Sequence, residues 1–391
     1  MRDGTVRCWG YNAHGELGDA STTNRVNPVS VSGLTGVVQL TGGYYHTCAR
    51  LAGGTARCWG YNGYGQLGDG TTTQRTSPVS VVGSLTNLTE IDAGIYHTCA
   101  VRRDGTVWCW GYNYYGQLGD LTGTDRATPV QVQNLFNVTE IAVGGYHTCA
   151  LRRDGLVWCW GYNNYGQLGD GTITDHSRPA PVPGLSNVVE LEAGFNHTCA
   201  RLADGSIRCW GYNGYGQLGN GGTASSSRPV QMPSFLGAVA LTGGQAHACA
   251  IMSDGTARCW GRGTEGQLGN NGAATVYTPV TVLVNSSSAL ANVVQIDAGI
   301  HHTCARMSDN SVRCWGWNAY GQIGDTTGTN RLVATPSLMN VTGTSTNVAI
   351  AATDIDAGYY HSCAVLATGG VRCWGRNDYG QLGDGSVYGR T

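Results

Sequence analysis

Cysteine and histidine are the residues of this chain whose types and spacing suggest chemistry. A representative stretch, His97 to Asp120, reads H-T-C-A-V-R-R-D-G-T-V-W-C-W-G-Y-N-Y-Y-G-Q-L-G-D, so that one His precedes Cys99 and Cys109. One imidazole and two thiolates suit Zn²⁺, but a structural zinc site needs a fourth ligand. The other chemistry open to the two thiols is oxidation to a disulfide. We favour the disulfide, beside a buried His that hydrogen-bonds to the backbone.

The cysteines recur as pairs separated by ten residues along almost the whole chain. These pairs use fourteen of the fifteen cysteines and leave only Cys8 without a partner. The predicted disulfides join Cys48 to Cys58, Cys99 to Cys109, Cys149 to Cys159, Cys199 to Cys209, Cys249 to Cys259, Cys304 to Cys314 and Cys363 to Cys373. Because disulfides persist in oxidising compartments, we expect an extracellular or cell-surface protein whose export signal lies outside this sequence.

Two short β-prone runs must position each cysteine pair. In the stretch above, Thr98–Val101 and Thr106–Trp110 flank the polar turn at residues 103–105, which predicts a β-hairpin with a three-residue loop. Counting outward from the turn places Cys99 opposite Cys109. A non-hydrogen-bonded pair at that position has its Cα atoms roughly 4.5 Å apart, and this separation allows a disulfide.

A Cys-Trp-Gly triplet marks each copy of this hairpin. The triplets start at residues 8, 58, 109, 159, 209, 259, 314 and 373, so successive steps are 50, 51, 50, 50, 50, 55 and 59 residues. Each unit contains four short β-prone runs punctuated by glycine and lacks helical periodicity, which is typical of a propeller blade. We therefore predict an all-β, seven-bladed β-propeller of four-stranded blades, with about 50 residues per repeat.

The predicted organisation is a single propeller domain over residues 1–391. Residues 37–391 supply seven repeats, and the last repeat lacks its final strand. Residues 1–36 form an N-terminal half-repeat, whose Pro28–Val31 run we expect to supply the strand that closes the C-terminal blade. Residues 1–19 then duplicate part of the last repeat. This surplus favours a fragment of a longer array, and head-to-tail self-assembly by strand exchange is the alternative.

Composition excludes several functional classes. Charged residues make up 12% of the chain and the formal net charge is −2, so we expect no nucleic-acid partner. All 23 basic residues are Arg, which removes Schiff-base lysine chemistry and the Walker-type phosphate lysine. The longest apolar runs are far shorter than a membrane span. No Ser/His/Asp set or carboxylate pair stands out from the repeat, so we expect no enzyme activity, no cofactor and no metal.

The repeat resembles that of the regulator-of-chromosome-condensation family. One copy reads G-G-Y-H-T-C-A-L over Gly144–Leu151 and D-G-L-V-W-C-W-G-Y-N-N-Y-G-Q-L-G over Asp154–Gly169, and similar copies cover essentially the whole chain. The resemblance implies a seven-bladed propeller, and the paired cysteines favour a secreted bacterial member. It implies no single activity, because propellers of this type serve as exchange factors, inhibitors, photoreceptors and scaffolds.

The residues that vary between copies are the candidates for partner binding. One variable set is the pair before the repeat His, where tyrosines supply rigid amphipathic anchors of the kind enriched at interfaces. A second set lies in the copy that replaces the Y-N-x-Y-G pattern with Arg262–Glu265. An alternative interpretation is that these side chains only pack the blades. The predicted partner-binding residues are Tyr44, Tyr45, Tyr96, Tyr146, Phe195, Asn196, His301, Tyr359, Tyr360, Arg262 and Glu265.

The sequence therefore predicts a non-enzymatic, extracellular binding or scaffold propeller that recognises a protein or glycan partner through aromatic loops on one face. We expect no membrane insertion. One alternative is a guanine-nucleotide exchange factor-like regulator of a small GTPase. Further alternatives are a structural subunit that assembles head-to-tail, and a lyase or hydrolase working in the central channel.

Overall fold

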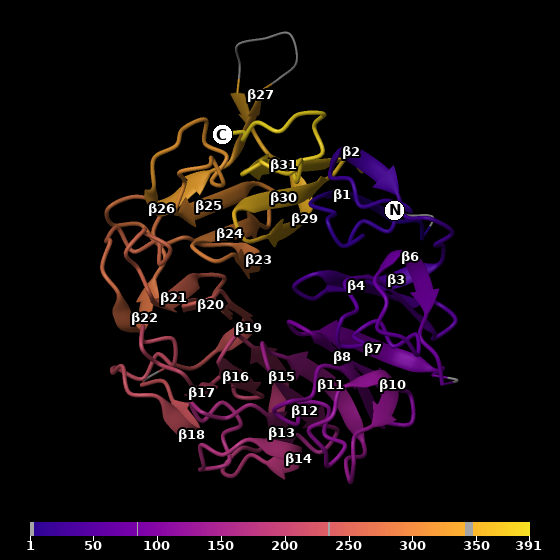
Figure 1. The fold of residues 1–391 in the computed structure, drawn as a ribbon. Helices are drawn as coiled ribbons and strands as arrows, with labels where there is room; N and C mark the ends of the chain where they lie inside the picture. Colours follow the sequence, from indigo (N-terminus) through magenta and orange to yellow (C-terminus); the bar gives the residue numbers. More distant parts are fainter. Residues whose placement is uncertain (1–3, 84, 234, 341–346) are drawn as a thin grey trace. The chain divides into compact units, whose positions relative to one another are not determined.

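Short antiparallel strands dominate the structure of this chain. The computed structural model describes residues 4–83, 85–233, 235–340 and 347–391 (Figure 1). The strands form six four-stranded sheets, one three-stranded sheet and two two-stranded sheets, and strands within a sheet follow one another in sequence. Among these described residues, no helix has the length and apolar character needed to cross a membrane. The predicted all-β class, a seven-bladed propeller of four-stranded blades, is confirmed.

The strand bounds repeat from blade to blade with little variation. The first three complete blades are β3 (Val37–Gly42), β4 (His46–Leu51), β5 (Ala56–Gly60) and β6 (Arg75–Ser80); β7 (Leu88–Ala93), β8 (His97–Arg102), β9 (Val107–Gly111) and β10 (Arg126–Gln131); and β11 (Val138–Val143), β12 (His147–Arg152), β13 (Val157–Gly161) and β14 (His176–Pro181). The next three are β15 (Val188–Ala193), β16 (His197–Leu202), β17 (Ile207–Gly211) and β18 (Ser226–Gln231); β19 (Ala238–Gly243), β20 (His247–Met252), β21 (Ala257–Gly261) and β22 (Val276–Thr281); and β23 (Val293–Ala298), β24 (His302–Met307), β25 (Val312–Gly316) and β26 (Arg331–Pro336).

The remaining strands lie near the two ends of the chain. They are β1 (Arg7–Gly10) and β2 (Arg25–Ser30), the small hairpin β27 (Leu338–Asn340) and β28 (Asn347–Ala349), and the three-stranded sheet β29 (Ala352–Ala357), β30 (His361–Leu366) and β31 (Val371–Gly375). The hairpin β27–β28 belongs to one of the two longer repeats, in which the step between Cys-Trp-Gly triplets is 59 residues.

The central hairpin of each blade has the register that the sequence predicts. In β8 and β9, Val101 pairs with Val107 and Cys99 pairs with Cys109. The closing hydrogen bond runs from the Arg102 N–H to the Thr106 carbonyl, at 2.9 Å. Gly105 has φ +77°, a conformation that favours glycine at this turn position. The local alternation of the two strands therefore fixes which residues face each other.

Opposite placement brings the cysteines together as predicted. Six pairs form disulfides with a Cα–Cα distance of 4.1 Å, and Cys199 and Cys209 are also disulfide-bonded. Cys99 and Cys109 are fully buried between adjacent blades, which shields the bond from reductants. Each bridge closes a short loop, so that it contributes roughly 2–3 kcal/mol to stability in the chain-entropy model. Cys8 has no partner, and burial raises the pKa of its thiol to about 12.

The N-terminal residues form half a blade. β1 pairs with β2 through Cys8 and Val29, and Val6 packs with Val31 against Trp59 of the β3–β6 blade. The sheet β29–β31 has three strands, and its last strand ends in an isolated bridge to Arg390. β2 is paired with β1. Closure of the C-terminal blade by the N-terminal strand stays a prediction, as does the single-domain organisation.

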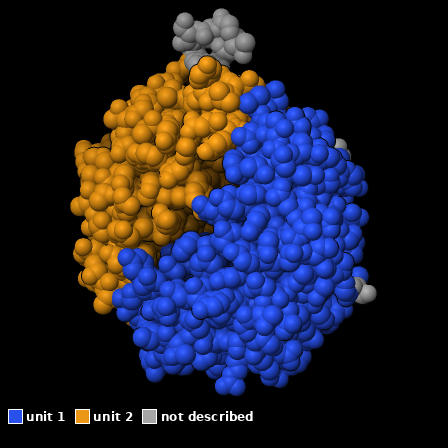
Figure 2. Space-filling model, viewed as in Figure 1, with its two compact units in different colours: residues 1–203, 210–212, 225–229 blue, residues 204–209, 213–224, 230–391 orange. Residues whose placement is uncertain are grey.

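The chain divides into two compact units (Figure 2). Unit 1 contains the half-blade, the blades β3–β6, β7–β10 and β11–β14, and the strands β15 and β16. Unit 2 contains the blades β19–β22 and β23–β26 and the sheet β29–β31. The units comprise residues 1–203, 210–212 and 225–229, and residues 204–209, 213–224 and 230–391.

Gly144 lies where one blade packs closely against the next, so a substitution there probes that packing. A Cβ atom at Gly144 would lie 2.2 Å from Cε1 of His147 and 2.7 Å from the carbonyl oxygen of Gly194. Because a packed backbone cannot move aside cheaply, we expect Gly144→Ala to lower the free energy of unfolding by roughly 1–3 kcal/mol. Guanidinium unfolding measures this. Gly53→Ala is the control, since no atom lies within 4 Å of its Cβ position; an equal loss in both variants would contradict the packing argument.

Candidate binding surface

A hydrogen-bonded clamp joins neighbouring blades wherever the residue after the repeat His is Thr or Ser; Ala248 is the exception, and there the Trp260 indole alone donates to the Gln217 carbonyl. Two donors of the β11–β14 blade, the Thr148 hydroxyl and the Trp160 indole, reach the carbonyl oxygen of Gln117 at 3.2 and 2.8 Å. His97 Nε2 lies 3.0 Å from the Thr148 hydroxyl oxygen. Because Thr148 has one proton and gives it to Gln117, His97 Nε2 must be the donor of this second bond. The network therefore fixes the His97 tautomer.

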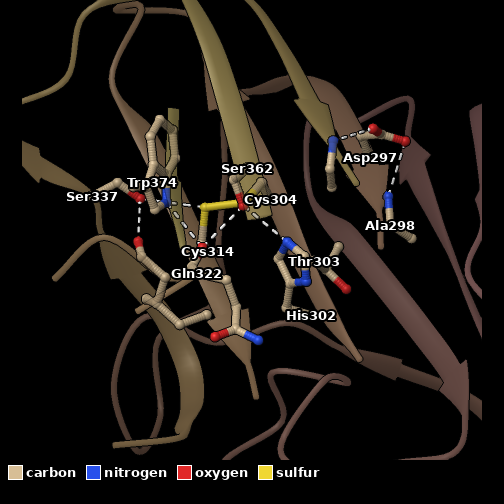
Figure 3. Close-up of a disulfide and its surroundings, with 12 residues drawn as sticks. Asp297, Ala298, His302, Thr303, Cys304, Cys314, Gln322, Ser337, Ser362 and Trp374 are labelled. Atoms are coloured by element: carbon tan, nitrogen blue, oxygen red, sulfur yellow. Dashed lines mark hydrogen bonds between the residues drawn. A yellow bond between two sulfur atoms is a disulfide. The ribbon is translucent and has the colours of Figure 1, made fainter. Parts of the chain in front are cut away.

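The same clamp recurs in unit 2, where Figure 3 shows it beside a disulfide. His302 Nε2 lies 2.9 Å from the hydroxyl of Ser362, and that hydroxyl donates to the carbonyl of Gln322 at 2.9 Å. Trp374 donates to the same carbonyl at 2.9 Å. Serine replaces the usual threonine here and keeps the hydroxyl that the clamp needs. The repeat His, hydroxyl and Trp are thus used in joining blades.

Burial keeps the repeat histidines uncharged. It lowers the pKa of His97, His147 and His302 to about 3, and that of His46 and His197 to about 4. Desolvation is the largest cause in every case, since a buried imidazolium loses its hydration. A neutral imidazole that is closed to solvent and engaged in a clamp is a structural group. It is not placed to act as an acid or base on a ligand.

The arrangement does not suit the zinc site that the same residues suggest. The sulfur atoms of Cys99 and Cys109 are bonded to each other, and His97 Nε2 is used by Thr148. Within the described part of the chain, no three His, Cys, Asp or Glu side chains are grouped so that they could hold a metal.

Carboxylates on the first strand of a blade cap the edge of the next blade. Asp92 accepts from the Val143 N–H at 2.9 Å and from the Thr41 hydroxyl at 3.0 Å. Glu90 accepts from the Ile141 N–H at 3.1 Å. Burial raises the pKa of Glu90 to about 8 and that of Asp92 to about 6. These acids satisfy edge N–H groups that would otherwise be unpaired.

Two loops lie side by side at the end of each central hairpin because they continue its pairing. His97 pairs with Gly111, and one step further the Tyr112 N–H donates to the Tyr96 carbonyl at 2.9 Å. The same bond joins Tyr162 to Tyr146 at 3.0 Å. The loop before the repeat His and the Y-N-x-Y-G loop therefore present their side chains together.

These two loops build a continuous row of rings in unit 1, which we call the tyrosine belt. Ring centroids of neighbouring members lie 4.5–6.5 Å apart, mostly with edge-to-face or tilted geometry. The ring of Tyr114 is the most open, at 70% exposed, and Tyr44 is 49% exposed. The belt consists of Tyr11, Tyr44, Tyr45, Tyr61, Tyr64, Tyr96, Tyr112, Tyr114, Tyr115, Tyr146, Tyr162, Tyr165 and Tyr212.

The structure brings several predicted binding residues into this belt. Tyr44, Tyr45, Tyr96 and Tyr146 belong to it, and Phe195 contacts Tyr146 at 6.2 Å between ring centroids. Asn196 contributes through its backbone, since its carbonyl accepts from the Tyr212 N–H at 2.9 Å. The tyrosines of the Y-N-x-Y-G loops were missed by the sequence interpretation, although extending the hairpin register by one residue predicts them.

In unit 2 the predicted residues adjoin one another. Tyr360 contacts Tyr359 at 6.4 Å and Trp317 at 5.3 Å, and Trp317 contacts His301 at 5.9 Å. Arg262 forms an ion pair with Glu265 at 2.6 Å. Burial lowers the pKa of His301, and the nearby charge of Arg262 lowers it further, whereas that of Glu265 raises it.

Ring packing also sets the ionisation of the phenols. Burial, followed by the charges of neighbouring groups, raises the pKa of Tyr112 to about 12 and raises the pKa values of Tyr45, Tyr96 and Tyr146. These four phenols are therefore neutral over the whole physiological range of pH. Such groups can bind through their ring faces or by hydrogen bonds.

Consecutive four-stranded blades, joined by clamps and ending in variable aromatic loops, define a β-propeller of the repeat type. The chain belongs to the family of the regulator of chromosome condensation (RCC1) repeat. The repeat model matches residues 3–50, 54–101, 104–151, 154–201, 204–251, 254–306 and 309–365. A second model of the same repeat matches seven segments between residues 37 and 381.

Curated relatives match this chain over short segments. The human probable E3 ubiquitin-protein ligase HERC4 is 34% identical over 91 residues, which are 23% of this chain and 8% of that protein. The ultraviolet-B receptor UVR8 of Arabidopsis thaliana is 34% identical over 105 residues, 26% of this chain and 22% of the receptor. The aligned segments thus span less than a quarter of either relative.

Solved structures share the fold at low sequence identity. Human WBSCR16 matches with a TM-score of 0.72 and 20% identity, covering 91% of this chain and 98% of that one. Prp20p from Saccharomyces cerevisiae matches with a TM-score of 0.68 and 21% identity, covering 91% and 89%.

The clamp histidines predict a specific loss of stability in acid. Because the folded-state pKa of His147 is about 3, the unfolded chain binds more protons below its ordinary value near 6.5. The free energy of unfolding contributed by this group is therefore retained above pH 6.5 and falls as the pH drops towards 3. Relative to His147→Gln, the wild type is expected to lose up to about 1.4 kcal/mol per pH unit between pH 6 and 4.

Urea unfolding at several pH values gives this difference directly. Comparison with the variant is needed because the raised pKa values of Glu90 and Asp92 oppose the trend: these carboxyls favour the folded state as the pH falls. His14→Gln is the control, since His14 is a half-exposed loop residue. Parallel pH profiles of the wild type and His147→Gln would refute the assignment.

Proposed function

We propose that this protein is a non-enzymatic binding propeller that recognises a protein or glycan partner through the tyrosine belt, in an extracellular or cell-surface setting. The observation that carries the proposal is the belt itself. Rings from adjacent blades stand next to one another on hairpins whose register is pinned by buried disulfides. Tyrosine has few rotatable bonds, so ordering it on binding costs little entropy, and it offers a ring face together with a hydroxyl.

The setting is supported by the cysteine chemistry. Buried bridges at one repeat position in successive blades are suited to an oxidising compartment, because a reducing one would keep the thiols free during folding. The non-enzymatic assignment is supported by the clamps, which use the repeat His and its hydroxyl partner for packing. A structure of Prp20p, a protein of the same fold, is described with its binding to Gsp1p and histones, which makes protein partners a reasonable first class to test.

Replacing exposed tyrosines of the belt by serine tests the proposal. We expect the pair Tyr44→Ser and Tyr114→Ser to abolish capture of partners from the native secreted fraction and from a glycan array, since both rings are open to solvent. Tyr388→Ser is the matched control, because Tyr388 is 73% exposed and lies outside the belt. Retention of the same partners by the double variant would overturn the proposal. Nucleotide release from small GTPases, or turnover of a substrate, would favour an exchange factor or an enzyme.

A further inference from the structure

In unit 2 the chain places arginines where the belt in unit 1 has tyrosines. The Arg376 guanidinium lies 5.2 Å from the ring centroid of Tyr320, 5.5 Å from that of Tyr360 and 5.9 Å from that of Tyr379. Its Nε also donates to the carboxylate of Asp378 at 2.7 Å. A guanidinium among aromatic rings and beside a carboxylate gains both cation–π and ion-pair attraction.

Arg376 occupies the same repeat position as Tyr112. The Arg376 N–H donates to the Tyr360 carbonyl at 2.9 Å, as the Tyr112 N–H does to the Tyr96 carbonyl. Arg262 stands at this position in another blade, where it lies 5.7 Å from the ring centroid of Tyr215 and pairs with Glu265. The ring arrangement of this family member therefore accepts a guanidinium wherever the chain supplies one.

In unit 1 the belt loops supply rings without Arg or Lys, and two carboxylates lie beside them. The loops of the belt, residues 11–16, 43–45, 61–66, 94–96, 112–117, 144–146 and 162–167, contain neither Arg nor Lys. Asp125 accepts from the N–H of Asn113, next to Tyr112, and Asp175 accepts from that of Asn163, next to Tyr162, both at 2.7 Å. Both carboxylates are exposed. The pKa values of Tyr112 and Tyr162 are raised mainly by burial, and the charges of neighbouring tyrosines and of Asp125 or Asp175 add to the increase.

We propose that the part of the belt on the blades β7–β10 and β11–β14 binds arginine side chains of a protein partner. The inference rests on the proposed function and narrows it to one recognition chemistry. A guanidinium stacks on an open ring such as Tyr114 while Asp125 or Asp175 neutralises its charge. Arginine fits better than lysine, because its planar, weakly hydrated group stacks on rings and pairs with a carboxylate at the same time. A neutral glycan can donate hydroxyl hydrogen bonds to the two carboxylates, but it leaves their charge unneutralised, whereas a guanidinium both donates and neutralises.

Fluorescence anisotropy of labelled hexa-arginine with the full chain tests the proposal. We expect binding that is tighter than that of hexa-lysine by about fivefold and stronger than that of hexa-citrulline, which is isosteric but uncharged. Asp125→Asn with Asp175→Asn should weaken hexa-arginine binding about fivefold, since each exposed pair is worth a modest energy. These variants should fold, because Asn330 already accepts from the Asn318 N–H at the same position of another blade.

The matched control removes the same charge elsewhere on the same blades. Asp104→Asn with Asp154→Asn alters exposed carboxylates in the hairpin turns, outside the belt. An equal loss in both double variants would mean only general charge attraction and would overturn the proposal. So would equal binding of hexa-lysine, or a preference for oligosaccharides such as cellohexaose. The two proposals can fail separately. If hexa-arginine does not bind the full chain, but the double variant Tyr44→Ser with Tyr114→Ser still fails to capture the partner of the wild type, the proposed function is supported and the arginine recognition is refuted.

Discussion

One main-chain carbonyl in each blade holds the next blade in place. The Gln117 carbonyl accepts from both Thr148 and Trp160, and His97 supports the threonine from the other side. All four residues are buried, so loss of any one leaves a polar group unpaired in a medium of low dielectric, which costs more than the bond gains. This asymmetry explains why His, hydroxyl, Trp and Gln recur together. The clamp, and not a shared catalytic site, is the reason for their repetition.

The clamp decides where function can lie. Because the repeated polar residues are used between blades, the loops beyond the hairpin can vary without disturbing the clamp. The pairing that seats the disulfide continues outward into these loops, as the bond between Tyr112 and Tyr96 shows. The disulfide-bonded hairpin is therefore a rigid support for loops whose sequence varies. In unit 1 the tips hold tyrosines, whereas in unit 2 Arg262, Trp317 and Arg376 replace some of them.

Local pattern was enough to predict the fold and the cysteine pairing. In a β-strand, side chains alternate between the two faces. The short turn between Thr98–Val101 and Thr106–Trp110 therefore leaves few possible pairing registers for the two strands, and in the observed one Cys99 faces Cys109. The contacts between blades could not be predicted in this way, because they join residues about 50 apart whose approach depends on packing. Thr148 and Gln117 carry no sign of their partnership in the sequence. The tyrosines before the repeat His were proposed as binding residues from the sequence, but their neighbours in the Y-N-x-Y-G loops were not; their role in binding stays a prediction.

Asp125 and Asp175 give the belt a polarity that ring packing alone would not supply. Neutral phenols attract apolar, polar and cationic groups alike, so a surface of tyrosine by itself selects little. Two exposed carboxylates repel acidic partners and favour basic ones, and they do so at blades where the loops hold no cation. Elsewhere in the chain the corresponding position holds Asn330, which makes the same backbone bond without the charge. Since Asn satisfies the loop equally well, the structural bond does not require a carboxylate. The carboxylate is therefore available for the contact with a partner that we propose.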